Sequence, residues 1–161
     1  MSNNARGLQE HNDDQQQKYE REARLTYDPS VVNDSIQRWN SYSEEQQEAI
    51  KAEQSQIYVD LADAMDAGKD EHSTEVEAIL NRWIENLRHF YEPSLDMLRG
   101  LGQMYNMDER FRKNFQNIHP DLPPFLTRVI DHYVDELETA EIERMLQEDD
   151  DMDQKNNRLS K

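Results

Sequence analysis

The side chains that could perform covalent chemistry are few in this sequence, and their spacing does not suit catalysis. The 161 residues include no cysteine, which excludes thiol nucleophiles, thiolate metal ligands and disulfides. No Gly-x-Ser-x-Gly elbow is present, and the serines fall mostly at predicted helix starts, where they act as caps. A phosphate-binding loop, a dinucleotide-binding glycine pattern and zinc-ligand spacing are also missing. We therefore expect that the protein is not an enzyme.

Metal chemistry would depend on the five histidines, His11, His72, His89, His119 and His132. None has a glutamate three residues before it, as a di-iron or di-manganese helical bundle would require. The reverse order, an acidic residue three positions after a histidine, occurs twice and places both side chains on one helix face. The two pairs are His89 with Glu92 and His132 with Asp135. Such pairs arise freely on helix surfaces when 33% of the residues are charged. The sequence therefore predicts no metal site and no cofactor.

The charge of the chain restricts its partners. Eighteen basic residues stand against 35 acidic ones, for a formal net charge of -17. Such a field repels nucleic-acid phosphates and anionic membranes, whereas neutral or cationic small molecules are tolerated. No apolar run has the length of a membrane span, and the N-terminus has no secretory pattern. We expect a cytoplasmic protein that binds neither nucleic acid directly nor a membrane.

Because the mean hydropathy is -1.13, folding requires the apolar residues to be concentrated in particular segments. In the front half they follow helical spacing. Asp28 before Pro29 is a typical helix start, because the carboxylate caps and the ring tolerates the first helical position. Ser43 and Gln46 form a capping box, and the apolar stripe behind it continues until Gly68. Two helices are predicted there.

The rear half predicts four more helices. Thr74 with Glu77 repeats the capping-box pattern, and a dense apolar face follows until Pro93. The remaining three starts are Ser94, Asp108 and the proline pair Pro123 and Pro124. No segment alternates with period two strongly enough to predict a strand. The predicted fold class is all-α, a compact array of about six helices joined by short loops.

Both ends of the chain are polar. Residues 1–23 contain few large apolar side chains and are expected to form a flexible arm. Residues 24–140 should form the folded domain. Residues 141–161 are expected to hold the end of the last helix followed by an acidic, disordered tail, because closely spaced like charges repel.

Aromatic and methionine side chains are abundant on the predicted helix faces: Trp39, Tyr42, Trp83, Phe90, Tyr91, Met97, Met104 and Tyr105. Such residues are typical of core packing, yet they would also line a binding cleft between helices. Gly100 and Gly102 interrupt a good helix, which indicates a close approach by another helix or by a ligand. Periodicity leaves both interpretations open.

Short sequence motifs in the chain resemble those of the TipAS antibiotic-recognition domain. The front half carries Tyr27-Asp28-Pro29, Arg38-Trp39-Asn40-Ser41-Tyr42-Ser43 and the run 57–65. The rear half carries Arg82-Trp83, Phe90-Tyr91-Glu92-Pro93, Leu98-Arg99-Gly100-Leu101-Gly102, Met104-Tyr105, Arg110-Phe111, the run 118–123 and Tyr133-Val134-Asp135. The resemblance covers about residues 24–138.

The resemblance implies a globin-like helical fold without haem, which disfavours a haem globin. It also implies binding of thiopeptides or other bulky apolar, antibiotic-like molecules, with the N-terminal helices ordering around the ligand. Most relatives carry a MerR-type DNA-binding domain and act in transcription. Only about 23 residues precede the domain here, so we expect no DNA-reading element in this chain.

The sequence departs from the family at one chemically important place. Relatives that capture thiopeptides covalently carry a cysteine shortly after the Phe-Tyr pair, where this chain has Pro93 after Glu92. A thiol would be needed to add to a dehydroalanine. Binding is therefore expected to be reversible.

Carried over to this chain, the resemblance places ten residues along the cleft: Trp39, Tyr42, Trp83, Phe90, Tyr91, Glu92, Pro93, Met97, Leu101 and Tyr105. The expected function is reversible sensing or sequestration of a bulky apolar ligand. The alternative is an acidic interaction module that docks a transcriptional regulator or another basic partner, which would be strongly salt-sensitive.

Overall fold

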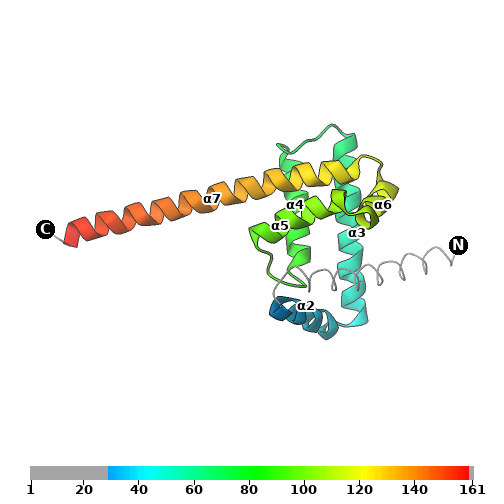
Figure 1. Cartoon of the computed structure of the whole chain (residues 1–161), viewed down its shortest axis with the longest axis horizontal. Helices are drawn as coiled ribbons and strands as arrows, with labels where there is room; N and C mark the ends of the chain where they lie inside the picture. The colour runs from blue at the N-terminus through cyan, green and yellow to red at the C-terminus, as the bar shows by residue number, and fades with distance from the viewer. Residues whose placement is uncertain (1–28, 160–161) are drawn as a thin grey trace.

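The computed structural model describes residues 29–159, and this part of the chain is all-α. The helices are α2 (Pro29–Ser41), α3 (Glu44–Asp66), α4 (Thr74–Leu87), α5 (Leu95–Met107), α6 (Glu109–Ile118) and α7 (Leu122–Leu159). Within residues 29–159 there is no strand. Figure 1 shows five of the helices and the first part of α7 gathered into one body, so the predicted fold class is confirmed. The predicted arm, residues 1–23, lies outside the described residues.

Most of the predicted helix caps are formed. Ser43 and Gln46 make a full capping box at the start of α3, and Ser94 and Asp108 accept backbone N–H bonds at the starts of α5 and α6. One prediction was wrong. The N-cap of α4 is Ser73, whose side chain accepts from the N–H of Glu75, because Ser73 is the residue with an extended backbone.

Helix α4 ends earlier than its apolar pattern predicted. The apolar face continues to Tyr91 in the sequence, but the helix stops at Leu87 and residues 88–94 form a tight connection to α5. Pro93 would stop a helix running through this segment, because a proline has no N–H and restricts the residue before it, but α4 already ends at Leu87. Phe90 and Tyr91 therefore project from the connecting segment, although both are buried.

Two antiparallel helix pairs build the body, with α3 beside α4 and α5 beside α7 (Figure 1). The α5 and α7 pair approaches very closely at Gly102, where an added Cβ would lie 2.8 Å from Cγ2 of Ile130. The Thr127 hydroxyl donates to the Gly102 carbonyl at 2.6 Å. The close approach that Gly102 predicted is therefore made by a helix of the protein itself.

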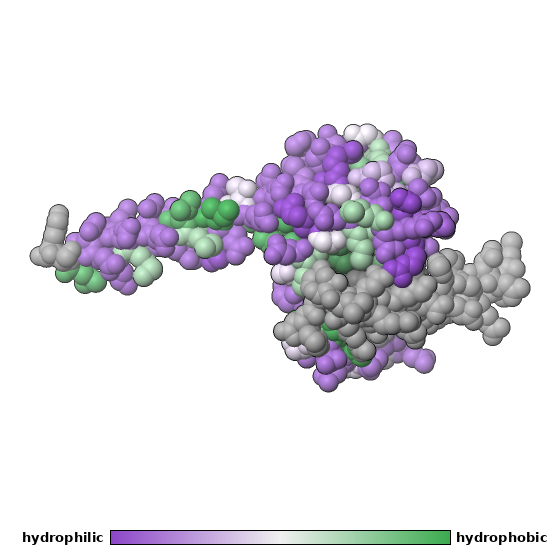
Figure 2. Space-filling view, in the orientation of Figure 1, coloured by the Kyte–Doolittle hydropathy of each residue, from purple (hydrophilic) through white to green (hydrophobic). Residues whose placement is uncertain are grey.

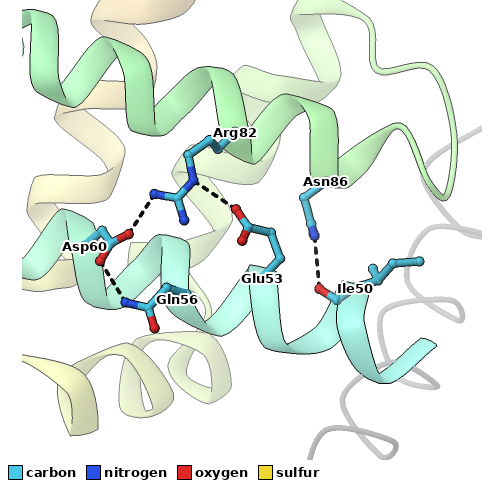
Figure 3. A network of polar contacts seen from close by, with 6 residues as sticks. All are labelled: Ile50, Glu53, Gln56, Asp60, Arg82 and Asn86. Carbon is cyan, nitrogen blue, oxygen red and sulfur yellow. Dashed lines mark hydrogen bonds and ion pairs between the residues drawn. The ribbon is translucent and has the colours of Figure 1, made fainter. Parts of the chain in front are cut away.

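A polar network fixes α4 against α3 (Figure 3). Arg82 donates to Glu53 at 2.9 Å and to Asp60 at 2.7 Å, and Gln56 donates to the other oxygen of Asp60 at 2.8 Å. The bond from Arg82 holds the pKa of Asp60 below its ordinary value. One turn away, the buried amide of Asn86 donates to the carbonyl of Ile50 at 3.0 Å. The network sets the register of the two helices.

The structure differs from the sequence prediction at the C-terminal end. The acidic segment predicted as a disordered tail continues α7 to Leu159 and projects away from the body (Figure 1). Its side chains are exposed, as expected from their charge. Pairs four residues apart, Arg144 with Glu148 at 3.1 Å and Gln147 with Asp151 at 3.3 Å, stabilise the helix. Between residues 29 and 159, no helix combines the length and apolarity needed to cross a membrane.

Candidate functional site

Most of the predicted aromatic site residues fall into two groups of ring contacts, together with rings that were not predicted for the site. The inner cluster lies between α3, α4, α5 and α6 and consists of Tyr58, Trp83, Tyr105, Phe111 and Phe115. The outer cluster joins α2 to the segment after α4 and consists of Trp39, Tyr42, His89 and Phe90. The two groups differ in packing and in access to solvent.

The inner cluster is tightly packed. Tyr105 is its centre, with ring centroids 6.0 Å from Tyr58, 6.4 Å from Trp83 and 4.9 Å from Phe115. The pairs meet edge to face, which is the favourable arrangement of aromatic quadrupoles. Trp83 is 1% exposed and Tyr105 is 5% exposed. These rings fill one another's space, so they form part of the hydrophobic core.

The polar atoms of the inner cluster are almost enclosed. The Tyr58 hydroxyl donates to the Tyr105 hydroxyl at 3.2 Å, and burial raises the pKa of Tyr58. The indole Nε1 of Trp83 is buried and has no hydrogen-bond acceptor. It is the one buried side-chain nitrogen or oxygen among residues 30–159 that lacks a hydrogen bond.

The outer cluster is half open to solvent. The Trp39 ring stacks on Phe90 with centroids 5.1 Å apart and an angle of 21° between the planes. Tyr42 meets Trp39 edge to face at 6.4 Å and His89 at 6.0 Å. Trp39 and Tyr42 are partly exposed, whereas Phe90 is buried beneath them. Helix α2 thus covers Phe90 with an aromatic ring that solvent still reaches.

Arg38 of α2 and Tyr42, the residue that follows α2, donate to carbonyls at the end of α4. His89 lies beyond Leu87, the last residue of α4, so its carbonyl takes no part in the hydrogen bonds of the helix. The Tyr42 hydroxyl donates to that carbonyl at 2.7 Å. Arg38 donates to the neighbouring Arg88 carbonyl at 3.4 Å. The end of α4 at Leu87 therefore leaves the backbone acceptors to which Tyr42 and Arg38 donate.

Mixed charges surround the outer cluster. The Lys51 ammonium lies 5.7 Å from the centroid of the Trp39 ring, a cation–π distance. The Arg88 guanidinium pairs with Glu85 and, at 3.3 Å, with Glu92. The side chain of Glu92 is 71% exposed, so this pair lies in solvent and is strongly screened.

The remaining predicted residues are divided between the buried core and partly exposed positions. Tyr91 and Leu101 are buried in the core, while Pro93 and Met97 are partly exposed. The structure thus brings Trp39, Tyr42 and Phe90 together and places Trp83 and Tyr105 in the inner cluster. Contact of any of these ten residues with a ligand stays a prediction.

Sequence reasoning missed several residues of the outer cluster. Arg38 and Lys51 were not singled out for the site, and His89 was considered only for metal binding. The His89 carbonyl could not be identified from the sequence, because its availability depends on α4 ending at Leu87 although the apolar pattern continues. Arg38 and Lys51 reach the cluster only through tertiary packing.

The described residues contain no group of three or more histidine or acidic side chains placed to hold a metal ion. The nearest approach to such a group is a contact between two rings, His72 and His132, with centroids 4.7 Å apart. His132 lies 3.6 Å from Glu136, whereas Asp135 pairs with Arg99 at 2.7 Å.

Comparison with known proteins gives three matches. The model of the TipAS antibiotic-recognition domain matches residues 19–133. The HTH-type transcriptional activator mta of Bacillus subtilis (strain 168) is 31% identical over 127 residues, which are 78% of this chain and 49% of mta. This chain spans about half the length of that curated relative.

Among solved structures, the chain is similar to TipAS of Streptomyces lividans in complex with nosiheptide, described as part of a thiopeptide antibiotic multidrug resistance system. The TM-score is 0.63 at 25% identity, and the match covers 73% of this chain and 84% of the other. The sequence resemblance and the architecture therefore agree.

Proposed function

This chain belongs to the TipAS antibiotic-recognition family, and on that premise we propose that it binds a bulky apolar, antibiotic-like molecule reversibly and without catalysis. The proposed binding place is the outer cluster, between α2 and the segment that connects α4 to α5. A thiopeptide is the first ligand to test, because the similar TipAS structure holds nosiheptide.

The observation that carries this proposal is the stack of Trp39 on Phe90, with nearly parallel rings 5.1 Å apart. A flat heteroaromatic ring has the shape and the polarisability to take the place of either partner. Phe90 lies in the connecting segment, whose path is fixed by the end of α4 and by Pro93. Phe90 thus supplies a fixed wall, while Trp39 supplies a movable one.

We take α2 as the movable element, although Val32 is buried and Gln47 donates to the Trp39 carbonyl at 2.8 Å, because its attachments to the connecting segment are individually weak. They include the aromatic stack, the Tyr42 bond to the His89 carbonyl, and the bond from Arg38 to the Arg88 carbonyl. Each such hydrogen bond contributes about 0.5–1.5 kcal/mol net. A ligand that replaces the stack could therefore displace α2 or reorder it around itself.

The absence of cysteine supports reversible binding. Covalent capture of a dehydroalanine needs a thiolate that adds to the carbon–carbon double bond to form a thioether, after which the α-carbon takes up a proton. No thiol exists in this chain to supply the sulfur. The bound molecule is expected to dissociate unchanged.

Tryptophan fluorescence of two single-tryptophan variants tests the location. Trp83→Phe leaves only Trp39, and Trp39→Phe leaves only Trp83. Titration with nosiheptide and a panel of polycyclic drugs should change the emission of the first variant much more than that of the second. If neither variant responds to any compound, the proposed function is wrong. A response confined to Trp83 would move the binding place to the inner cluster.

Intact-mass spectrometry tests reversibility. After incubation with a thiopeptide that carries a dehydroalanine, the wild-type mass should stay unchanged and dialysis should restore the original fluorescence. The matched variant Pro93→Cys introduces a thiol near the position used by covalent relatives and should gain a mass adduct. An adduct on the wild-type chain would contradict reversible binding.

The alternative function, an acidic module that docks a basic partner, is compatible with ligand binding. The projecting part of α7 lies far from α2 (Figure 1), so the two functions would use different surfaces. Docking of a transcriptional regulator stays a prediction.

A further inference from the structure

The projecting part of α7, residues 141–159, carries an unusual concentration of exposed apolar side chains. Eight large apolar side chains are exposed among the described residues, and five of them lie on this segment. Their exposed fractions lie between 53% and 77%. The five are Ile142, Met145, Leu146, Met152 and Leu159. Figure 2 shows green atoms interrupting the purple surface of this projection.

These side chains follow the spacing of a helix-pairing face. Met145, Met152 and Leu159 recur every seven residues, and Ile142 and Leu146 flank the first of them on the same side. A seven-residue repeat keeps a stripe facing one partner helix. Methionine adapts to irregular partner surfaces. The segment therefore has the form of one half of a helix–helix contact.

The charge around the stripe determines which partner fits. Residues 141–153 hold seven acidic side chains and one arginine. Asp149 lies between Met145 and Met152 on the same face, and Glu148 and Asp150 lie beside it. A second copy of this chain would bring two such acidic faces together, which is strongly unfavourable. An anionic membrane surface would be repelled for the same reason.

We propose that the projecting part of α7 is a docking surface for a cationic amphipathic helix of a partner protein. Apolar side chains of that helix would cover the stripe around Met145 and Met152. Its lysines or arginines would pair with carboxylates such as Asp149 and Asp150. This surface is independent of the outer cluster, so ligand binding is not required for docking.

The full chain can be tested by fluorescence anisotropy with a labelled 18-residue peptide of leucine and lysine arranged with helical period. A scrambled peptide of equal composition is the matched probe. The helical peptide should bind at least about tenfold more tightly than the scrambled one, because only the first presents an apolar face. Raising the salt concentration should weaken its binding. Equal affinity of the two peptides would overturn the proposal.

Variants locate the surface. The triple substitution I142S/M145S/L146S should weaken helical-peptide binding about tenfold, because it removes exposed apolar area from the stripe. The matched control Met107→Ser removes a side chain that is 79% exposed at the end of α5, and it should leave the affinity unchanged. An unchanged affinity in the triple variant would also overturn the proposal.

Three further results would assign the stripe to another occupant and so overturn the proposal. One is a wild-type dimer in sedimentation velocity that the triple variant dissociates. Another is triple-variant-sensitive binding to phosphatidylcholine vesicles. The third is a marked gain in peptide affinity when residues 1–28 are removed, which would identify that segment as the natural cover.

Discussion

The inner and outer aromatic clusters use the same residue types in opposite ways. In the inner cluster, Trp83 packs edge to face on Tyr105 and is 1% exposed. In the outer cluster, Trp39 stacks on one buried ring and keeps a solvent-exposed side. The inner rings form part of the hydrophobic core, whereas the outer rings attach α2 to the surface of that core. Aromatic composition therefore does not separate core rings from accessible rings, whereas the packing of α2 does.

The largest expected effect separates the two tryptophans. Trp83→Ala should lower the free energy of unfolding by about 3–5 kcal/mol, because it opens a cavity inside the inner cluster. Trp39→Ala should cost about 1 kcal/mol, since its ring is partly exposed. Urea denaturation followed by circular dichroism measures both. Equal losses would show that the two clusters are one cooperative core.

A second effect concerns the helix pair behind the inner cluster. Gly102→Ala should lower the free energy of unfolding by about 1–2 kcal/mol, because the new Cβ meets Cγ2 of Ile130 at 2.8 Å and its Cβ at 3.0 Å. The gain in helix propensity, at most about 1 kcal/mol, offsets only part of this. In a double-mutant cycle with Ile130→Ala, the two costs should be less than additive. Full additivity would mean that the helices do not approach this closely.

A smaller effect should be confined to the outer cluster. Tyr42→Phe removes the hydroxyl that donates to the His89 carbonyl and should cost about 0.5–1.5 kcal/mol. Hydrogen exchange should quicken in α2 while protection of α4 stays the same. A matched control is Tyr133→Phe, which removes a hydroxyl bond that joins α7 to Asn81 of α4. Faster exchange throughout the chain after Tyr42→Phe would contradict a separately attached α2.

The smallest expected effect is a pH dependence of the α3 and α4 pair. The pKa of Asp60 is held below its ordinary value by Arg82, so the ionised form stabilises the fold at neutral pH. That contribution is present above the unfolded pKa, about 3.9, and is lost as the pH falls through the lower folded value. Asp60→Asn should remove about 1 kcal/mol at pH 7 and flatten the loss between pH 4 and pH 2.

Urea midpoints across that pH range measure this contribution. Asp63→Asn is the control, since Asp63 is an exposed neighbour on the same helix. Identical pH profiles for both variants would show that the bond between Arg82 and Asp60 contributes nothing.

Much of the architecture followed from the sequence because caps and apolar stripes act locally. Ser43 with Gln46, Ser94 and Asp108 mark helix starts that the structure contains. The clear errors lie at helix ends. Ser73 replaced Thr74 as a cap, and α4 stopped at Leu87 although its apolar pattern continued. Apolar periodicity does not distinguish a helix face from a buried connecting segment.

The projecting helix shows a different limit. Charge density predicted a disordered tail, but α7 continues to Leu159 and is supported by side-chain pairs such as Arg144 with Glu148. Repulsion between like charges opposes the helix, whereas side-chain pairs four residues apart stabilise it. Composition alone therefore does not decide the conformation of such a segment.

The sequence by itself determined the helix content, the acidic charge, the absence of a thiol and the membership in an antibiotic-recognition family, because each depends on residue identity or local spacing. Only the tertiary structure decided which aromatic rings are sealed in the core and which remain accessible. It also paired Tyr42 with the His89 carbonyl, 47 residues away. Burial and long-range pairing depend on the angles at which helices cross, and the sequence of one helix alone does not determine those angles.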